Sequence, residues 1–175
     1  MEVIQDNKTA PHSEDLSLWS YFVRCITTKY SDFSGRARRK EWWGFVLFQL
    51  LIFIVPITLY SLMGGSLFLW ATLIVVLLLF VPWLAVTCRR FHDVGLSTGL
   101  FWVVGGLTIL KNVIALFVMI EPGVIPHAVT SISKILSYLT GLVMLVIAFI
   151  PGKTGPNAYG PDPKPAPNYE GYGQI

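Results

Sequence analysis

One uncharged stretch limits the possible folds of this chain more than any other feature. Residues 42–88 are 47 consecutive positions without Asp, Glu, Lys, Arg or His. As a single helix this stretch would be roughly 70 Å long at about 1.5 Å per residue, whereas the hydrocarbon core of a bilayer is about 30 Å thick and takes about 20 residues. Paired glycines in "MGGS" at 63–66 favour a turn. We therefore predict two membrane spans, over 43–62 and 67–87.

Two further apolar runs follow, at 100–120 and 135–150. Lys111 and Asn112 interrupt the first, and the second reaches spanning length only if it begins near Ile132. The segment 121–134 between them contains two prolines and is predicted to be a loop. Only 13% of residues are charged, against about 25% in a typical soluble domain. The predicted fold class is therefore all-α, a polytopic membrane protein with four transmembrane helices.

The polar ends of the chain suggest a division into three parts. Residues 1–32 form an N-terminal segment, 33–152 the four-helix membrane domain, and 153–175 a tail rich in proline and glycine. Ser13 is a candidate N-cap for a short amphipathic helix, whose apolar positions recur at helical spacing from Leu16 to Tyr30. This helix either lies on the membrane surface or packs on the rest of the protein. The tail is predicted to form successive turns, with Tyr159 as a candidate anchor at the lipid headgroups.

The distribution of Lys and Arg predicts the orientation in the membrane, because these residues accumulate on the cytoplasmic side of spans. With four spans, eleven cations fall on one side and only Lys134 on the other, with Lys111 inside the membrane. We therefore expect both termini and the segment 89–95 to be cytoplasmic. The eleven are Lys8, Arg24, Lys29, Arg36, Arg38, Arg39, Lys40, Arg89, Arg90, Lys153 and Lys164.

Three stretches together resemble a known family. They are "FSGRARRKEWW" at 33–43, "PWLAVTCRRFHDVG" at 82–95 and "PGKTGPNAYGPDP" at 151–163. The chain is similar in these motifs to the small bacterial inner-membrane proteins catalogued as domain of unknown function 805. The resemblance implies an integral, multi-pass protein of the bacterial inner membrane without an established biochemical activity.

The first two motifs contain the candidate binding residues. Antiparallel spans joined by a tight turn would bring both motifs to the same membrane face. Six cations are then candidates for one basic surface that binds anionic lipid headgroups or a phosphorylated ligand: Arg36, Arg38, Arg39, Lys40, Arg89 and Arg90. In the alternative, the cations only orient the spans and form local ion pairs. Asp93 then pairs with an arginine of the first motif, and Glu41 pairs with Arg89 or Arg90. His92 belongs to the same motif.

A second polar group lies inside the third predicted span. Thr108, Lys111 and Asn112 are spaced i, i+3, i+4 and therefore share one helix face. An ionisable residue at membrane depth usually faces the interior of the bundle or water. We predict that this face packs against the other spans. In the alternative, Lys111 extends to the outer headgroups.

The sequence favours a structural or interaction protein whose basic cytoplasmic face contacts anionic lipid or a partner. A homo-oligomer or a membrane-protein partner is compatible with it. One alternative is a small transporter or an oligomeric pore. A second is an enzyme that modifies a lipid or envelope precursor, using His92 with Asp93. No phosphate loop, dinucleotide fingerprint or nucleophile elbow is present, so we expect no enzymatic activity. We also expect no cofactor, no metal site and no nucleic-acid partner.

Overall fold

The computed structural model describes residues 16–64, 66–120 and 126–164. These residues form five helices, four of which are long and apolar enough to cross a membrane. The all-α prediction with four candidate spans is therefore confirmed. The helices are α1 (Leu18–Ile26), α2 (Arg39–Met63), α3 (Ser66–Val94), α4 (Thr98–Ile120) and α5 (His127–Phe149).

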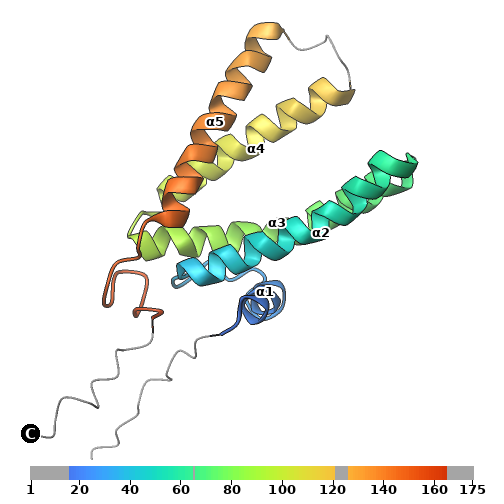
Figure 1. Ribbon diagram of the computed structural model, residues 1–175. Coiled ribbons are helices and arrows are strands. Elements are labelled where there is room, and N and C mark those ends of the chain that lie inside the picture. Colours follow the sequence, from blue (N-terminus) through green and yellow to red (C-terminus); the bar gives the residue numbers. More distant parts are fainter. Residues whose placement is uncertain (1–15, 65, 121–125, 165–175) are drawn as a thin grey trace, which may run out of the picture.

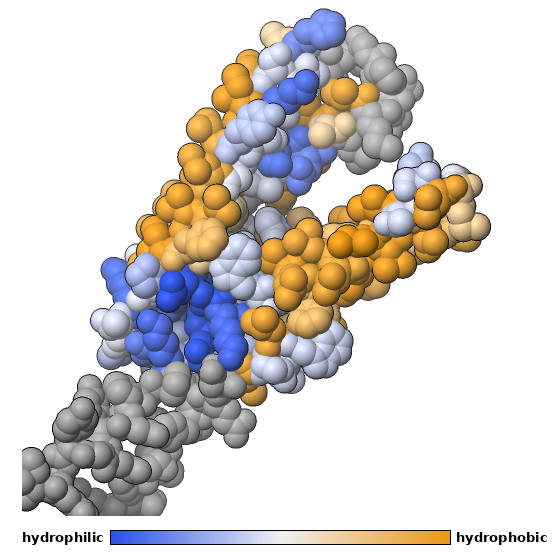
Figure 2. All heavy atoms as spheres, viewed as in Figure 1, coloured by the Kyte–Doolittle hydropathy of each residue, from blue (hydrophilic) through white to orange (hydrophobic). Residues whose placement is uncertain are grey.

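The four long helices form two antiparallel hairpins, α2–α3 and α4–α5 (Figure 1). The hairpins meet at the end where α2 and α4 begin and α3 and α5 finish, and they diverge away from it. We call the shared end the polar end and the opposite end the far end. Hydrophilic side chains gather at the polar end, whereas apolar side chains cover much of both hairpins (Figure 2). A second hydrophilic area lies on the upper part of the α4–α5 hairpin.

Two glycines with positive φ stop the helices of the first hairpin. Gly64, at φ 67°, follows α2, and its N–H donates to the Tyr60 carbonyl at 2.9 Å. Gly95, at φ 86°, follows α3, and the next residue, Leu96, donates its N–H to the Phe91 carbonyl at 2.9 Å. This backbone conformation favours glycine because it has no Cβ. Both helices therefore end at residues suited to reversing the chain.

The last span begins earlier than the sequence suggested. The prediction of a loop through residue 134 and a span from near Ile132 is wrong, because α5 begins at His127. Pro126 precedes it with a φ of −55°, and its carbonyl accepts the N–H of Thr130 at 3.2 Å. The Thr130 hydroxyl also donates to the His127 carbonyl at 2.8 Å. These bonds let a first turn with hydroxyl side chains remain helical.

Helix α1 packs on the first hairpin instead of standing apart. Its N-cap is Ser17, whose side-chain oxygen accepts the N–H of Ser20 at 3.1 Å. The prediction of Ser13 as the cap is wrong because the helix begins at Leu18; Ser13 itself lies outside the described residues. Tyr21, Phe22 and Cys25 are buried, and Phe22 and Cys25 pack in one apolar cluster with α2 and α3, as expected for the packed alternative.

The interior of the protein is concentrated at the polar end. Phe45 of α2 and Val86 of α3 are fully buried in one apolar cluster with α1. Phe91 of α3 packs edge-on against Phe101 of α4, with ring centroids 5.5 Å apart, in a second cluster that includes Ile147 of α5. Together these clusters join the two hairpins and fix the position of the polar side chains between them.

Candidate functional site

Five charged side chains are buried together at the polar end. Arg36 precedes α2, Glu41 lies in the first turn of α2, and three residues come from the last two turns of α3. No side chain of the group belongs to a residue more than 5% exposed. We call this group the ion cluster; it consists of Arg36, Glu41, Arg89, Arg90 and Asp93. It forms because the antiparallel hairpin places the beginning of α2 beside the end of α3.

Arg89 and Glu41 form the first ion pair of the cluster. The Arg89 Nη1 donates to Glu41 Oε1 at 2.7 Å, and Arg89 is fully buried. Cys25 of α1 lies beside both, with its sulfur 3.7 Å from Arg89 Nη2 and 3.8 Å from Glu41 Oε1. Burial raises the pKa of the Cys25 thiol to about 11, so the thiol is neutral at physiological pH and a poor nucleophile. This pair connects α1, α2 and α3.

Asp93 accepts two arginines at once. Arg36 donates its Nε to Asp93 Oδ1 at 3.0 Å, and its Nη2 lies 3.0 Å from the same oxygen. Arg90 donates to the other oxygen, Oδ2. A buried charge is tolerated only when opposite charge and hydrogen bonds compensate it. With three arginines and two carboxylates, the cluster has a formal charge of +1, so its remaining N–H groups need neutral acceptors.

Backbone carbonyls supply those acceptors. Arg90 donates to the carbonyls of Ile147, at 3.1 Å, and Ile150. Both lie at the end of α5, where the last carbonyls of a helix have no partner within the helix. Arg36 donates to the carbonyls of Lys153 and, at 2.6 Å, Gly155. The ion cluster therefore fixes the end of α5 and the residues that follow it.

The residues after α5 fold back over the end of α3. We call residues 151–164 the C-terminal strap. The Lys153 N–H donates to the Asp93 carbonyl at 2.8 Å, and the Asn157 amide donates to the His92 carbonyl at 3.0 Å. Gly152 is buried so close to Asp93 that an added Cβ would lie 2.0 Å from its carboxylate. The strap therefore needs glycine at this position.

His92 joins three segments at the strap. Its Nδ1 lies 3.0 Å from the Gly35 carbonyl, and its Nε2 lies 2.8 Å from the Thr98 hydroxyl. A carbonyl only accepts, so Nδ1 carries the hydrogen and Nε2 is free to accept from Thr98. Tyr159 stacks on the imidazole, so its ring lies against the end of α3.

This geometry separates the six predicted basic residues into two sets. Arg36, Arg89 and Arg90 are inside the ion cluster and make their bonds to carboxylates and carbonyls of the protein. The expectation of one surface made of all six cations is therefore wrong for these three, because the hairpins and the strap cover them. Of the other three, Arg39 is exposed, Lys40 is half-buried, and Arg38 is half-buried with its Nη1 atom inside the protein. Glu41 and Asp93 pair with arginines of the two motifs, as the pairing alternative predicted.

The intramembrane polar group is only partly inside the bundle. Thr108 and Lys111 are half-buried, whereas Asn112 is exposed. The Lys111 ammonium donates to the Asn112 side-chain oxygen at 3.1 Å, and the Thr108 hydroxyl donates to the Val104 carbonyl at 2.9 Å. The prediction that all three pack inward is therefore wrong for Asn112. The neighbouring residues Leu110 and Val113 are exposed.

Sequence reasoning missed Cys25, Gly152 and Asn157 as members of the site. The third motif, at 151–163, was the available signal, because it contains both Gly152 and Asn157. Cys25 gave no such signal, since a lone cysteine is most often a small buried apolar residue. Within the described ranges, no group of three or more His, Cys, Asp or Glu side chains is placed to hold a metal ion.

Comparisons with known proteins match most of the chain. The family described as "Protein of unknown function (DUF805)" matches residues 30–161. The Inner membrane protein YhaH of Escherichia coli (strain K12) is 30% identical over 149 residues, 81% of this chain and 95% of the relative. The Inner membrane protein YhaI of the same strain is 30% identical over 139 residues, 79% and 92% of the two chains. No solved structure matches the chain.

Proposed function

Because this chain belongs to the DUF805 family, we propose that it is a bacterial inner-membrane interaction protein, with both termini in the cytoplasm and a basic cytoplasmic face that contacts anionic phospholipid. The relatives are inner membrane proteins by name, which supports the location. The proposed role is one of binding and organisation and includes no catalysed reaction.

The charge difference between the two ends of the bundle carries this proposal. Of the thirteen Lys and Arg residues, Lys8 lies outside the described ranges, and ten others are at the polar end. Lys111 and Lys134 lie toward the far end. The polar end has four described carboxylates, and two of these are inside the ion cluster. Since Lys and Arg accumulate on the cytoplasmic side, we assign the polar end to that side.

The surface cations are the residues that can reach lipid. Seven described cations at the polar end are exposed or half-buried: Arg24, Lys29, Arg38, Arg39, Lys40, Lys153 and Lys164. The anionic cytoplasmic leaflet attracts such residues by about 1 kcal/mol for each cation near its surface. The buried arginines contribute by fixing the ends of the helices that carry this surface. The ion cluster is therefore assigned a structural role.

Fusions at the C-terminus test the orientation. A cytoplasmic C-terminus should make a fluorescent-protein fusion bright and an alkaline phosphatase fusion inactive. A phosphatase fusion inserted between α4 and α5 should be active as the matched control. Strong phosphatase activity from the C-terminal fusion would reverse the assignment of the polar end.

Lipid retention tests the binding role. The protein is extracted in mild detergent, exposed to an equal mixture of phosphatidylglycerol and phosphatidylcholine, and analysed by native mass spectrometry. We expect phosphatidylglycerol to be retained preferentially, and the preference to weaken at high salt because surface charges are screened. Equal retention of the two lipids would remove the lipid-contact part of the proposal.

A further inference from the structure

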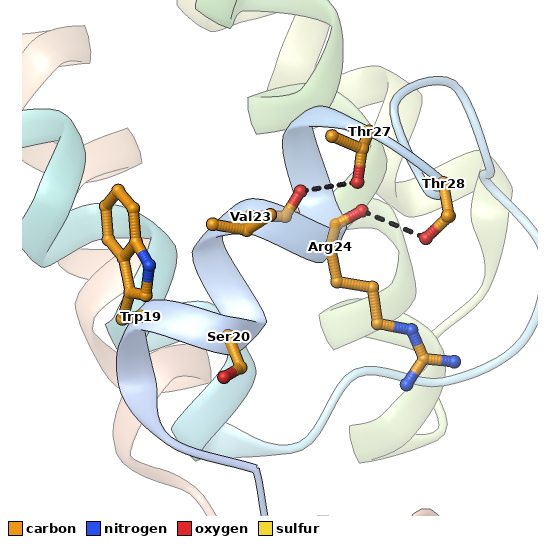
Figure 3. A pocket seen from close by; sticks show the side chains of 6 residues that line it. All are labelled: Trp19, Ser20, Val23, Arg24, Thr27 and Thr28. Carbon is orange, nitrogen blue, oxygen red and sulfur yellow. Dashed lines mark hydrogen bonds between the residues drawn. The ribbon is translucent and has the colours of Figure 1, made fainter.

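Helix α1 has an outward-facing hollow that the ion cluster does not involve. Figure 3 shows the side chains around it, with Ser20 between Trp19 and Arg24. The opposite face of α1 is buried against α2 and α3, so the hollow is on the outside of the protein. Its lining residues are Trp19, Ser20, Val23, Arg24, Thr27 and Thr28.

Contacts of α1 place the hollow beside the spans. The Leu18 backbone lies on Gly44 of α2, where an added Cβ would be 2.9 Å from the Leu18 carbonyl oxygen. The Trp19 ring packs edge-on against Phe48, with centroids 5.0 Å apart. Farther along the chain, the Tyr30 hydroxyl donates to the carbonyl of Leu78 in α3 at 2.9 Å. These positions of α2 and α3 belong to apolar spans, so α1 is a neighbour of the membrane and not a distant cytosolic helix.

The lengths of α2 and α3 explain how α1 can lie at headgroup level. The two helices have 25 and 29 residues, which makes them roughly 37 and 43 Å long at about 1.5 Å per residue. Both are longer than the hydrocarbon core of a bilayer, which is about 30 Å thick. Helices that are too long for the core tilt. Figure 1 shows α1 on the flank of this hairpin that faces away from α4–α5. A tilt of the hairpin toward that flank would bring α1 to the headgroups on the side of the polar end.

The hollow combines the chemical groups that a phospholipid headgroup requires. Trp19 is 55% exposed and provides an indole ring of the kind that is favoured at the membrane interface. Arg24 is exposed at the end of α1 and can bind a phosphate with two parallel N–H groups. The Ser20 hydroxyl, which is 2.9 Å from the Ser17 hydroxyl, can act as donor or acceptor.

The remaining polar groups are acceptors and suit the neighbouring glycerol hydroxyls. The Thr27 hydroxyl donates to the Val23 carbonyl at 2.7 Å, and the Thr28 hydroxyl donates to the Arg24 carbonyl at 3.4 Å. Their hydrogens are therefore used, while their oxygen lone pairs remain available. The apolar side chains of Trp19 and Val23 match the first carbons of an acyl chain. A free phosphate has no group for this apolar part of the hollow.

From this combination we propose that the α1 hollow is a binding site for one anionic glycerophospholipid of the phosphatidylglycerol type, with Arg24 on the phosphate and Trp19 against the glycerol and upper acyl chain. The inference rests on the proposed function, because it names the place where the basic face holds lipid. It also gives α1 a role in the lipid contact that is separate from that of the first motif.

Substitution of Arg24 in the full-length protein tests the site. Arg24→Gln should weaken the binding of one phosphatidylglycerol molecule about fivefold, measured by titrating the lipid in native mass spectrometry in mild detergent. Arg24→Lys should fall between this variant and the parent, because lysine keeps the charge but not the paired N–H groups. Lys134→Gln removes the same charge at the far end and should retain as much lipid as the parent.

A second measurement needs no substitution and separates a lipid from a free anion. Photoactivatable phosphatidylglycerol should attach to the parent protein within residues 18–28, and millimolar inorganic phosphate should not prevent this. Cross-links spread evenly over the apolar surface, or full competition by inorganic phosphate, would overturn the lipid site.

The two proposals fail in different ways. If the parent prefers phosphatidylglycerol but Arg24→Gln retains as much of it as the parent, the α1 site is wrong and the basic face remains. If the parent shows no preference, the lipid contact is wrong, and the α1 site falls with it. If Arg24→Gln is too unstable to purify, the cross-linking map decides.

Discussion

The Tyr159 ring lies flat on the His92 imidazole, with ring centroids 3.9 Å apart and planes inclined by 1°. These residues are in the C-terminal strap and the last turn of α3. The contact closes the strap over the ion cluster, together with the bond from the Asn157 amide to the His92 carbonyl at 3.0 Å. It shows that the third sequence motif is a structural partner of the second.

Loss of this stacking should release the strap. Tyr159→Ala removes the ring, and stacked aromatic pairs contribute about 0.5–1.5 kcal/mol beyond burial, so trypsin should cleave after Lys153 faster than in the parent. Tyr159→Phe keeps the ring and should resist cleavage like the parent. If both variants are cleaved at the parental rate, the stack does not hold the strap.

Gly152 should not tolerate a side chain. An alanine Cβ would lie 2.0 Å from Asp93 Oδ2, so Gly152→Ala must move the strap or the carboxylate. We expect a loss of about 1–3 kcal/mol, visible as a lower thermal unfolding midpoint in detergent. Gly141→Ala in α5 is the matched control, because nothing lies within 4 Å of its added Cβ, and it should unfold at or above the parental temperature.

Breaking the Arg89–Glu41 pair should destabilise the protein strongly. Arg89→Gln leaves a buried carboxylate without its partner, and such changes cost about 3–5 kcal/mol, so the variant should accumulate poorly and unfold early. The exposed Arg39 is the control, and Arg39→Gln should change stability by about 0.5 kcal/mol or less.

A double variant gives this prediction its decisive comparison. Glu41→Gln combined with Arg89→Gln removes both charges, so it should be less destabilised than the sum of the two single changes. Additive losses, or an Arg89→Gln protein as stable as Arg39→Gln, would show that the pair is not coupled as the structure indicates.

The Cys25 thiol should be unreactive at neutral pH. Burial raises its pKa from the ordinary 9.0 to about 11, so roughly one molecule in a thousand is a thiolate at pH 8. Because the folded pKa is the higher one, this group's contribution to stability is complete below about pH 9 and is lost as the pH rises through about 11.

Alkylation of a Cys88→Ala protein measures this difference. Iodoacetamide should label Cys25 only when the pH approaches the raised pKa or when the protein unfolds. A cysteine introduced by Ser31→Cys, at an exposed position in a protein that lacks both native cysteines, should be labelled readily at pH 8. Equal labelling rates at pH 8 would show that Cys25 is accessible and has an ordinary pKa.

The sequence by itself determined the membrane architecture. In hydrocarbon, each backbone N–H and C=O must be bonded within its own segment, so long apolar runs must become helices. The uncharged residues 42–88, with glycines at 64 and 65, therefore predicted the α2–α3 hairpin closely. The start of α5 was missed because hydropathy does not register that Thr130 bonds its hydroxyl within the helix.

The sequence also narrowed the partners in the candidate site. It predicted that Asp93 pairs with an arginine of the first motif and that Glu41 pairs with Arg89 or Arg90. The structure selects Arg36 for Asp93 and Arg89 for Glu41, and it adds Arg90 to Asp93. Motif spacing and an antiparallel hairpin were sufficient to limit the ion-pair partners, because they place both motifs at one end of the bundle.

Only the tertiary structure decided which cations are buried in the interior of the protein. A count of charges treats Arg36, Arg39 and Arg90 alike, although burial depends on what packs over each side chain. Arg90 is covered because the end of α5 supplies carbonyl acceptors from 57 residues away, and Arg36 because the strap reaches it from 119 residues away. Such contacts exist only once both hairpins have met, so the same positive charge that orients the chain in the membrane becomes, for three of its arginines, part of the interior.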